Sequence, residues 1–337
     1  MTDRDLPHER GAVAERPDAG GGAATPSYAL PTDAATGMPG PPKTLRIGPA
    51  MLDWGTRTYV MGVLNVTPDS FSGDGLLAAA DPVEAAVTQA RGMVEAGADL
   101  LDIGGASSRP GHVRLSPDEE TARVVPVVRA VAAALPGTPI SVDTTSPAVA
   151  SAALDAGAHL LNDIWGVAED DAMSRLAAQR QVPIVLMHNR AEPRYRNLVA
   201  EVVADLQRAL DRALDAGVPW DHLVVDPGFG FGKTPDHNLA LLAELEALAV
   251  LGRPVLLGTS RKSTLGKVLD LPADQRVEAT VATTVLAIAA GVDIVRVHDV
   301  RQNVRAARTA DAVVRGWRPQ GWGQVAPAPA PDTGQRP

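Results

Sequence analysis

Eight short apolar segments recur along the chain, and this repetition restricts the possible folds more than any other feature of the sequence. They are Tyr59–Leu64, Asp99–Ile103, Pro139–Val142, His159–Leu161, Pro183–Met187, His222–Val225, Pro254–Leu257 and Asp293–Val297. Each segment is too short for a stable helix and lacks alternation with polar residues. Both properties are typical of strands that are buried on both faces of a parallel sheet.

Alanine-rich stretches with helical spacing separate these segments. Several begin where a capping side chain precedes a proline, as at Asp81-Pro82 and Ser116-Pro117. Several end at a glycine, such as Gly157, which accepts the left-handed conformation that stops a helix. The clearest stretches are Pro82–Ala96, Pro117–Leu135, Ser146–Ala156, Asn197–Ala216 and Val277–Ala290. A strand, a helix and a glycine in repeated order predict parallel βαβ units.

Two arrangements can be built from such units, a closed barrel and an open doubly wound sheet. The count of eight and the length of residues 44–317 both favour a TIM-type (β/α)8 barrel. No glycine-rich dinucleotide fingerprint follows the first strand, where Asn65 and Thr67-Pro68-Asp69 stand instead. We therefore predict the barrel, with Leu45–Asp53 forming a β-hairpin that plugs its bottom. Residues 1–43 and 318–337, rich in Pro, Gly and Ala, are predicted to be disordered tails.

Composition excludes several classes of function. The chain has no cysteine, which removes disulfides, zinc–thiolate sites and thiol nucleophiles. Its formal net charge of -9 argues against nucleic-acid or anionic membrane partners. The apolar stretch from Val285 to Val292 ends at Asp293, too short to span a bilayer. No secretory leader is visible, so we expect a cytoplasmic protein.

Polar side chains follow each predicted strand, at the end of the barrel where such folds build their sites. Asp143, Asn162 and Asp226 come from three of these strands and should converge. Two carboxylates beside an amide suit a fused heterocycle with amino, ring N–H and oxo groups. An acid/base pair, a metal site or structural ion partners remain alternatives for the same residues.

A cationic set stands at neighbouring strand ends, namely Arg109, Arg261, Lys262, Arg296 and His298. Alternation along the last strand turns Arg296 and His298 the same way, with Asn65 on the adjoining strand. An oxyanion such as pyrophosphate with Mg²⁺ suits this cluster. His188 fits a ligand-binding or a structural role equally well. Phe71, Phe229 and Phe231, which are all of the phenylalanines, lie in these loops and would cover a flat ligand or plug the barrel mouth.

The motifs at these strand ends resemble those of the dihydropteroate synthase family. The run Val60–Ser72 is similar to the first family signature, and Gly104–Gly111 is similar to the second. The remaining motifs follow in family order, namely Asp143-Thr144, Asn162-Asp163, Asp226–Phe231, Ser260–Ser263 and Arg296–Val300. The resemblance covers about residues 45–317 and neither tail.

The resemblance implies an enzyme that joins 6-hydroxymethyl-7,8-dihydropterin pyrophosphate to p-aminobenzoate and releases 7,8-dihydropteroate and pyrophosphate. It assigns pterin binding to Asp143, Asn162, Met187, Asp226 and Lys262. It assigns pyrophosphate binding to Asn65, Arg109, Arg296 and His298, with Mg²⁺ on Asn65. It assigns the p-aminobenzoate pocket, where sulfonamides compete, to Ser108, Pro110, Phe231, Ser260 and Lys262. It places Asp69 and Arg109 on loops that close over the site, and it makes Asp143, Lys262, Arg296, His298, Asp69 and Arg109 the catalytic set.

The chain departs from the family pattern at a few positions. Ala106 stands where the family usually has Glu, Ser108 replaces Thr, Asn189-Arg190 follows His188, and Thr264-Leu265 is smaller than usual. A pterin-binding paralogue without synthase activity is therefore one alternative. A methyltetrahydrofolate-dependent methyltransferase on the same barrel is another, but it has no need of the Ser260–Ser263 and Arg296–His298 motifs. The family also suggests a homodimer through the outer helices.

Overall fold

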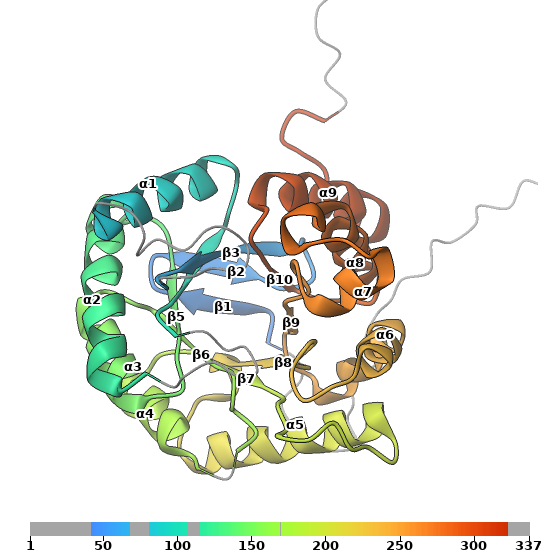
Figure 1. The fold of residues 1–337 in the computed structure, drawn as a ribbon, viewed down its shortest axis with the longest axis horizontal. Helices are drawn as coiled ribbons and strands as arrows, with labels where there is room; N and C mark the ends of the chain where they lie inside the picture. The colour runs from blue at the N-terminus through green and yellow to red at the C-terminus, as the bar shows by residue number, and fades with distance from the viewer. Residues whose placement is uncertain (1–41, 68–80, 107–114, 169, 323–337) are drawn as a thin grey trace, which may run out of the picture.

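Eight parallel strands form the central sheet in the part of the chain that the computed structural model describes, residues 42–67, 81–106, 115–168 and 170–322 (Figure 1). They are β3 (Tyr59–Asn65), β4 (Leu100–Gly104), β5 (Ile140–Asp143), β6 (Leu160–Asp163), β7 (Ile184–Met187), β8 (Leu223–Asp226), β9 (Leu256–Leu257) and β10 (Ile294–Val297). Their order is β8-β7-β6-β5-β4-β3-β10-β9. A parallel bridge between Val225 and Val255 joins the two ends of this order, so the predicted (β/α)8 barrel is confirmed.

Helices surround the barrel and connect its strands (Figure 1). They are α1 (Pro82–Glu95), α2 (Pro117–Ala134), α3 (Pro147–Ala156), α4 (Ala172–Arg180), α5 (Leu198–Asp215), α6 (Pro235–Ala243), α7 (Ser263–Leu269), α8 (Val277–Ala289) and α9 (Val300–Val314). The predicted start signals work as expected, because the Asp81 carboxylate accepts from the N–H groups of Val83 and Glu84. Gly157, at φ +113°, ends α3 in the left-handed conformation.

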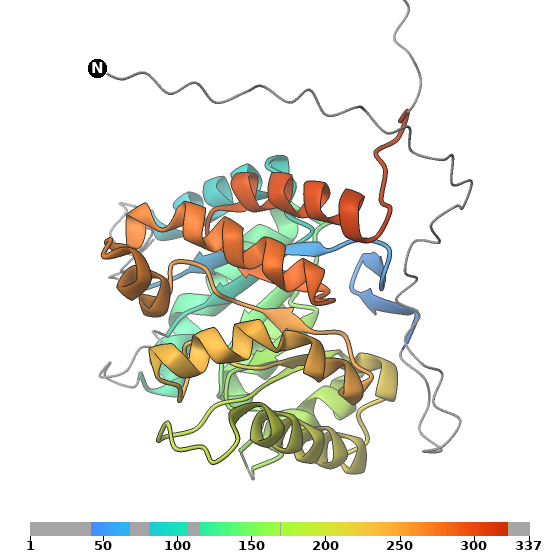
Figure 2. The ribbon, with the colours of Figure 1, turned by 90° about the vertical axis from the view of Figure 1, so that its right-hand side faces the viewer.

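The predicted hairpin is also present, as β1 (Thr44–Ile47) paired antiparallel with β2 (Ala50–Asp53). Figure 2 places it at one end of the barrel, at the amino ends of the strands. Leu45, Ile47 and Leu52 are buried there and pack against the first inward-facing residues of the strands. The hairpin therefore closes the bottom of the barrel with an apolar layer. The predicted tails, residues 1–43 and 318–337, lie almost wholly outside the described residues.

Side-chain alternation explains what fills the barrel above this apolar layer. The residues that touch the hairpin include Leu100, Leu160, Val224 and Ile294. Two positions further along a strand, the side chain returns to the same face. Those positions hold Asp102, Asn162, Asp226 and Arg296. The barrel interior thus changes from apolar at the bottom to polar at the carboxyl ends of the strands, where the site lies.

Candidate active site at the mouth of the barrel

The strand register places three of the predicted site residues at one level. Asn65 lies opposite Gly104, Gly104 opposite Asp143, and Asp143 opposite Asn162 in neighbouring strands. Met187 and Asp226 form a similar pair at the ends of β7 and β8. The predicted convergence of polar groups at the carboxyl ends of the strands therefore follows directly from the pairing.

An ion-pair network crosses the barrel interior from β10. The guanidinium of Arg296 donates from Nε to Asp102 Oδ2 at 2.6 Å and from Nη2 to Asp143 Oδ2 at 2.8 Å. Asn162 Nδ2 donates to the same Asp102 oxygen at 3.0 Å. Two residues predicted to bind pterin are thus tied to one predicted to bind pyrophosphate. The residues predicted to bind pterin therefore lie beside a residue predicted to bind pyrophosphate.

Burial controls the charges in this network. It raises the pKa of Asp143 to about 7, although Arg296 acts in the opposite direction. Burial alone would lower the pKa of Arg296, but the carboxylates of Asp102 and Asp143 outweigh it and raise that pKa. The cation is therefore permanent, whereas the Asp143 carboxyl gains or loses its proton near neutral pH.

A second cluster of site residues surrounds Lys262, which lies directly before α7. Burial lowers the pKa of Lys262 to about 8, while Asp226 acts to raise it. Burial also raises the pKa of Asp226, whose Oδ1 accepts from Gly228 N at 2.7 Å. Lys262 Nζ donates to the carbonyl of Phe229 and lies 4.4 Å from the centroid of the Phe231 ring. An ammonium, a carboxylate and an aromatic face thus share one side of the mouth.

His298 and Ser260 meet beside the network. His298 Nδ1 lies 2.9 Å from Ser260 Oγ, and the His298 backbone N–H donates to the same oxygen at 3.1 Å. Arg261, which the sequence groups with the cationic set, is instead paired with Asp299 at 2.6 Å. Its backbone has a φ of +58°. The ion pair with Asp299 occupies two of its guanidinium nitrogens, so Arg261 is a weaker candidate for anion binding than the sequence suggests.

Comparison with known proteins identifies the family to which this arrangement belongs. Residues 61–298 match the profile of the family described as pterin binding enzyme. The chain is 46% identical to a dihydropteroate synthase of Clostridium beijerinckii over 272 residues, which is 80% of this chain and 100% of that protein. The chain belongs to the dihydropteroate synthase family.

Two further comparisons agree. A dihydropteroate synthase of Bacillus subtilis is 48% identical over 266 residues, 79% of this chain and 92% of that protein. The crystal structure of a dihydropteroate synthase from Clostridium difficile, determined in the presence of pteroic acid, superposes with a TM-score of 0.75 at 44% identity. It covers 79% of this chain and 100% of its own.

One site residue of this dihydropteroate synthase family member is missed by the sequence analysis. Asp102 is fully buried and contacts both Arg296 and Asn162, but it lies inside the predicted strand Asp99–Ile103 and not after it. Its second oxygen, Oδ1, is buried and has no hydrogen-bond partner among the described residues. A carboxylate within a run buried on both faces is the signal that could have revealed it.

The interpretation of Phe229 as a cover for a flat ligand is wrong. Its side chain is fully buried in the hydrophobic core, whereas Phe231 is only partly buried. His188 is completely buried too and is held by Asp205 and Lys233. The remaining predicted loop residues lie outside the described residues, namely Asp69, Phe71, Ser108, Arg109 and Pro110.

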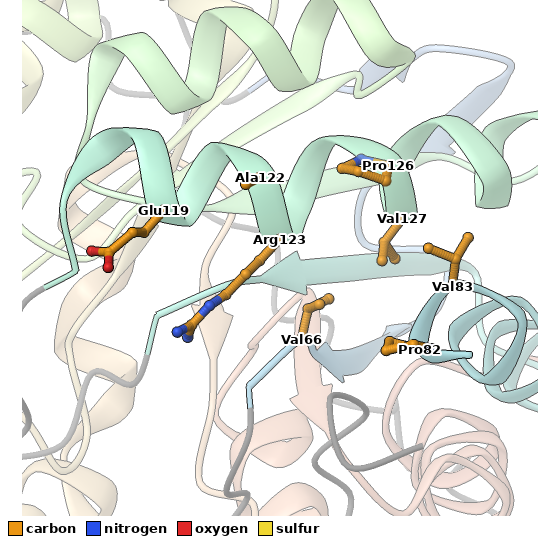
Figure 3. A pocket seen from close by; sticks show the side chains of 8 residues that line it. All are labelled: Val66, Pro82, Val83, Glu119, Ala122, Arg123, Pro126 and Val127. Atoms are coloured by element: carbon orange, nitrogen blue, oxygen red, sulfur yellow. The ribbon is translucent and has the colours of Figure 1, made fainter. Parts of the chain in front are cut away.

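The described residues provide few side chains that could act as metal ligands. Within this part of the chain, His, Asp and Glu residues form no cluster of three that could hold a metal ion. The amide oxygen of Asn65 is a hard donor that suits Mg²⁺, which takes most of its other ligands from phosphate and water when it binds nucleotides and diphosphates. A groove of about 340 Å³ lies outside the barrel, between the end of β3, α1 and α2 (Figure 3), and the described residues that line it include none of the predicted site residues.

Proposed function

We propose that this chain catalyses the dihydropteroate synthase reaction. It joins 6-hydroxymethyl-7,8-dihydropterin pyrophosphate to p-aminobenzoate and releases 7,8-dihydropteroate and pyrophosphate. The observation that carries the proposal is the ion pair of Arg296 with Asp143, because it puts an anion-binding group beside a group that suits the pterin ring. The family membership of the chain supports the same reaction.

The reaction needs no side-chain nucleophile. The bond between the pterin methylene carbon and the diphosphate oxygen breaks, and its electron pair leaves with the diphosphate. The amine nitrogen of p-aminobenzoate then forms the new C–N bond and loses a proton. Because the electron-rich dihydropterin stabilises a positive methylene carbon, Asp143 and Asp226 stabilise the charge that spreads into the ring. Asn162 and Lys262 orient the ring, with Met187 against its face.

Arg296 is suited to hold the departing diphosphate while it keeps its carboxylate partners. A guanidinium has five N–H donors, and the contacts to Asp102 and Asp143 use Nε and Nη2. The side chain is 20% exposed, so it reaches the mouth where the diphosphate would lie. His298 directly follows the same strand, β10, and Asn65 ends the neighbouring strand, β3. The developing negative charge is thereby stabilised at the point where it forms.

Mg²⁺ is proposed as the cofactor, held by Asn65 together with diphosphate oxygens. When bound, it neutralises part of the charge on the leaving group. Phe231, Ser260 and Lys262 are proposed to form the described part of the p-aminobenzoate pocket. Phe231 and Lys262 are in contact, which favours an aromatic ring with a carboxylate at this position.

The assembly is proposed to be a homodimer through outer helices. Val285 and Leu286 on α8 are exposed, the latter by 55%, which supports a contact of this helix with a second copy. Every helix in the described ranges is too short or too polar to qualify as a membrane span. A cytoplasmic location and the lack of nucleic-acid partners stay predictions.

Pyrophosphate release by the purified chain tests the reaction. With both substrates present, one pyrophosphate should appear for each 7,8-dihydropteroate detected by mass spectrometry. Slow release without p-aminobenzoate, with a trapped water or thiol adduct of the pterin, is expected if the bond breaks before the amine attacks. Tight binding of the pterin substrate without any turnover would instead identify a pterin-binding paralogue, the alternative that Ala106 raises.

A further inference from the structure

Lys233 ends the glycine-rich loop of residues 228–233, and its ammonium group is surrounded by acceptors. Nζ lies 2.9 Å from His188 Nδ1, 3.1 Å from the carbonyl oxygen of Gly228 and 3.2 Å from that of Phe231. An ammonium has three N–H donors, so these three contacts satisfy it completely. Lys233 thus ties its own loop to the segment that follows β7.

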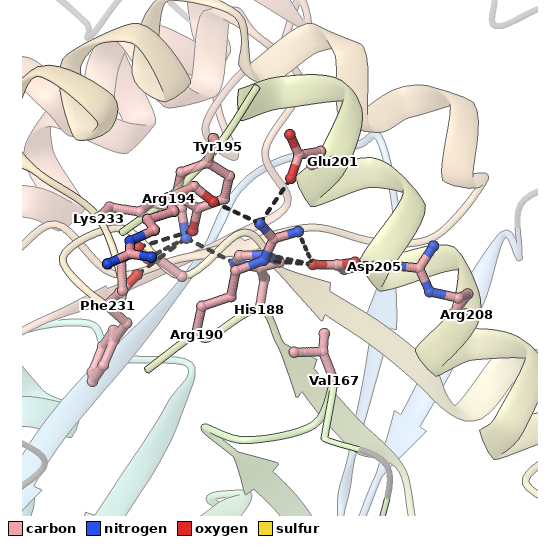
Figure 4. Close-up of polar contacts among 12 residues, drawn as sticks. Val167, His188, Arg190, Arg194, Tyr195, Glu201, Asp205, Arg208, Phe231 and Lys233 are labelled. Atoms are coloured by element: carbon pink, nitrogen blue, oxygen red, sulfur yellow. Dashed lines mark hydrogen bonds and ion pairs between the residues drawn. The ribbon is translucent and has the colours of Figure 1, made fainter. Parts of the chain in front are cut away.

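The partner of Lys233 is itself fixed from the other side (Figure 4). Burial lowers the pKa of Lys233 to about 7. In its ammonium form Lys233 cannot accept a hydrogen bond, so His188 Nδ1 then accepts and the ring proton is on Nε2. Nε2 then donates to Asp205 Oδ2 on α5 at 3.1 Å, and Arg190 donates to the same oxygen at 2.7 Å. Burial lowers the pKa of His188 to about 3, which keeps the ring neutral as this arrangement requires.

The loop is confined between two other segments. Gly228, Gly230 and Gly232 all have positive φ, and an added Cβ would have no room at any of them. At Gly228 and Gly232 it would collide with the backbone of His188 and Arg190, whereas at Gly230 it would lie 2.7 Å from Lys262 Cδ. The loop therefore transmits the position of the segment after β7 to Lys262.

Two residues proposed for the aminobenzoate pocket depend on this loop. Phe231 belongs to it, and its carbonyl accepts from Lys233. Lys262 donates to the carbonyl of Phe229 and packs over the Phe231 ring. Of the residues proposed to bind pterin, Lys262 and Asp226 also contact the loop, the latter by accepting from Gly228 N. The contacts among Asp102, Asp143, Asn162 and Arg296 do not involve the loop. A change in the loop should thus affect one substrate more than the other.

We propose that Lys233 is a positioning residue for the aromatic amine substrate. Through His188 and Asp205 it holds the loop so that Phe231 and Lys262 form the amine pocket, without touching the substrate itself. The inference rests on the proposed function, because it assigns the amine pocket of that same reaction.

The test compares Lys233→Met with Lys267→Met, in which the control lysine is exposed on α7. For Lys233→Met we expect the KM for p-aminobenzoate to rise about tenfold and the KM for the pterin substrate to rise by a clearly smaller factor. Hydrogen exchange of the peptide that covers residues 228–232 should become faster. Lys267→Met should match the wild type in all three measurements.

Tyr195→Phe provides a milder variant in case Lys233→Met folds poorly. The Tyr195 hydroxyl donates to the Gly232 carbonyl at 2.9 Å, so its removal loosens the same loop and should raise the same KM about threefold. If both variants leave the KM for p-aminobenzoate unchanged, or change only kcat in proportion to the folded fraction, Lys233 is merely structural and the inference is wrong. A wild-type chain that releases no pyrophosphate refutes the proposed function, and the inference with it.

Discussion

The substitution Asp102→Asn should separate the positioning of Arg296 from simple loss of stability. The fully buried Asp102 carboxylate accepts 2.6 Å and 3.0 Å hydrogen bonds from Arg296 and Asn162 on a single oxygen. Asparagine keeps the shape but removes the charge. Hydrogen bonds to charged groups contribute about 1.5–3 kcal/mol each and neutral ones about 1 kcal/mol, so we expect a loss of about 2 kcal/mol in the free energy of unfolding.

Transition-state stabilisation should fall by a similar amount, because Arg296 would move toward its remaining partner Asp143. A loss of about 2 kcal/mol in transition-state stabilisation lowers kcat/KM about 30-fold. Steady-state kinetics and urea unfolding measure the two effects. Asp99→Asn is the matched control, since Asp99 precedes the same strand but pairs with Arg57 at the bottom of the barrel. A variant Asp102→Asn that unfolds more easily but keeps its kcat/KM would refute the positioning role.

Three further results are expected. Burial raises the pKa of Asp143 to about 7 and lowers the pKa of Lys262 to about 8. The value of kcat/KM should therefore rise through pH 7 as Asp143 ionises and fall above pH 8 as Lys262 loses its proton. A flat profile between pH 6 and 9 would contradict this expectation. Ile47→Ala, in the fully buried hairpin plug, should lower the free energy of unfolding by about 2–5 kcal/mol with unchanged KM values, as measured by urea unfolding and kinetics. Removing divalent metal with EDTA should abolish turnover, and Mg²⁺ should restore it; calorimetry should find binding of the dephosphorylated pterin unaffected.

The fold was predictable because its signals are local. Short apolar runs, capping residues such as Asp81 and terminal glycines such as Gly157 each act within a few residues. The hairpin plug followed from the same patterns and is confirmed. What local patterns cannot supply is the pairing register, which sets Asn65, Asp143 and Asn162 at one level.

The site was predictable where its residues lie at or just after the carboxyl ends of the strands. Asp102 was missed because its role depends on the partners Arg296 and Asn162, which lie far away in sequence. Phe229 was misjudged because position in a loop does not determine burial, and its ring turns into the core. The network of Lys233 was not foreseen either, since Asp205 on α5 completes it.

The central claim is that a pterin-binding site and an anion-binding site lie side by side at the barrel mouth. Calorimetric measurement of the binding of two related ligands tests this claim most directly. The ligands are 6-hydroxymethyl-7,8-dihydropterin and its pyrophosphate ester. His298→Gln should weaken only the ester, whereas Asp226→Asn should weaken both. If His298→Gln weakens both ligands equally, or if the wild type binds the ester no more tightly than the alcohol in the presence of Mg²⁺, the two groups do not form one site.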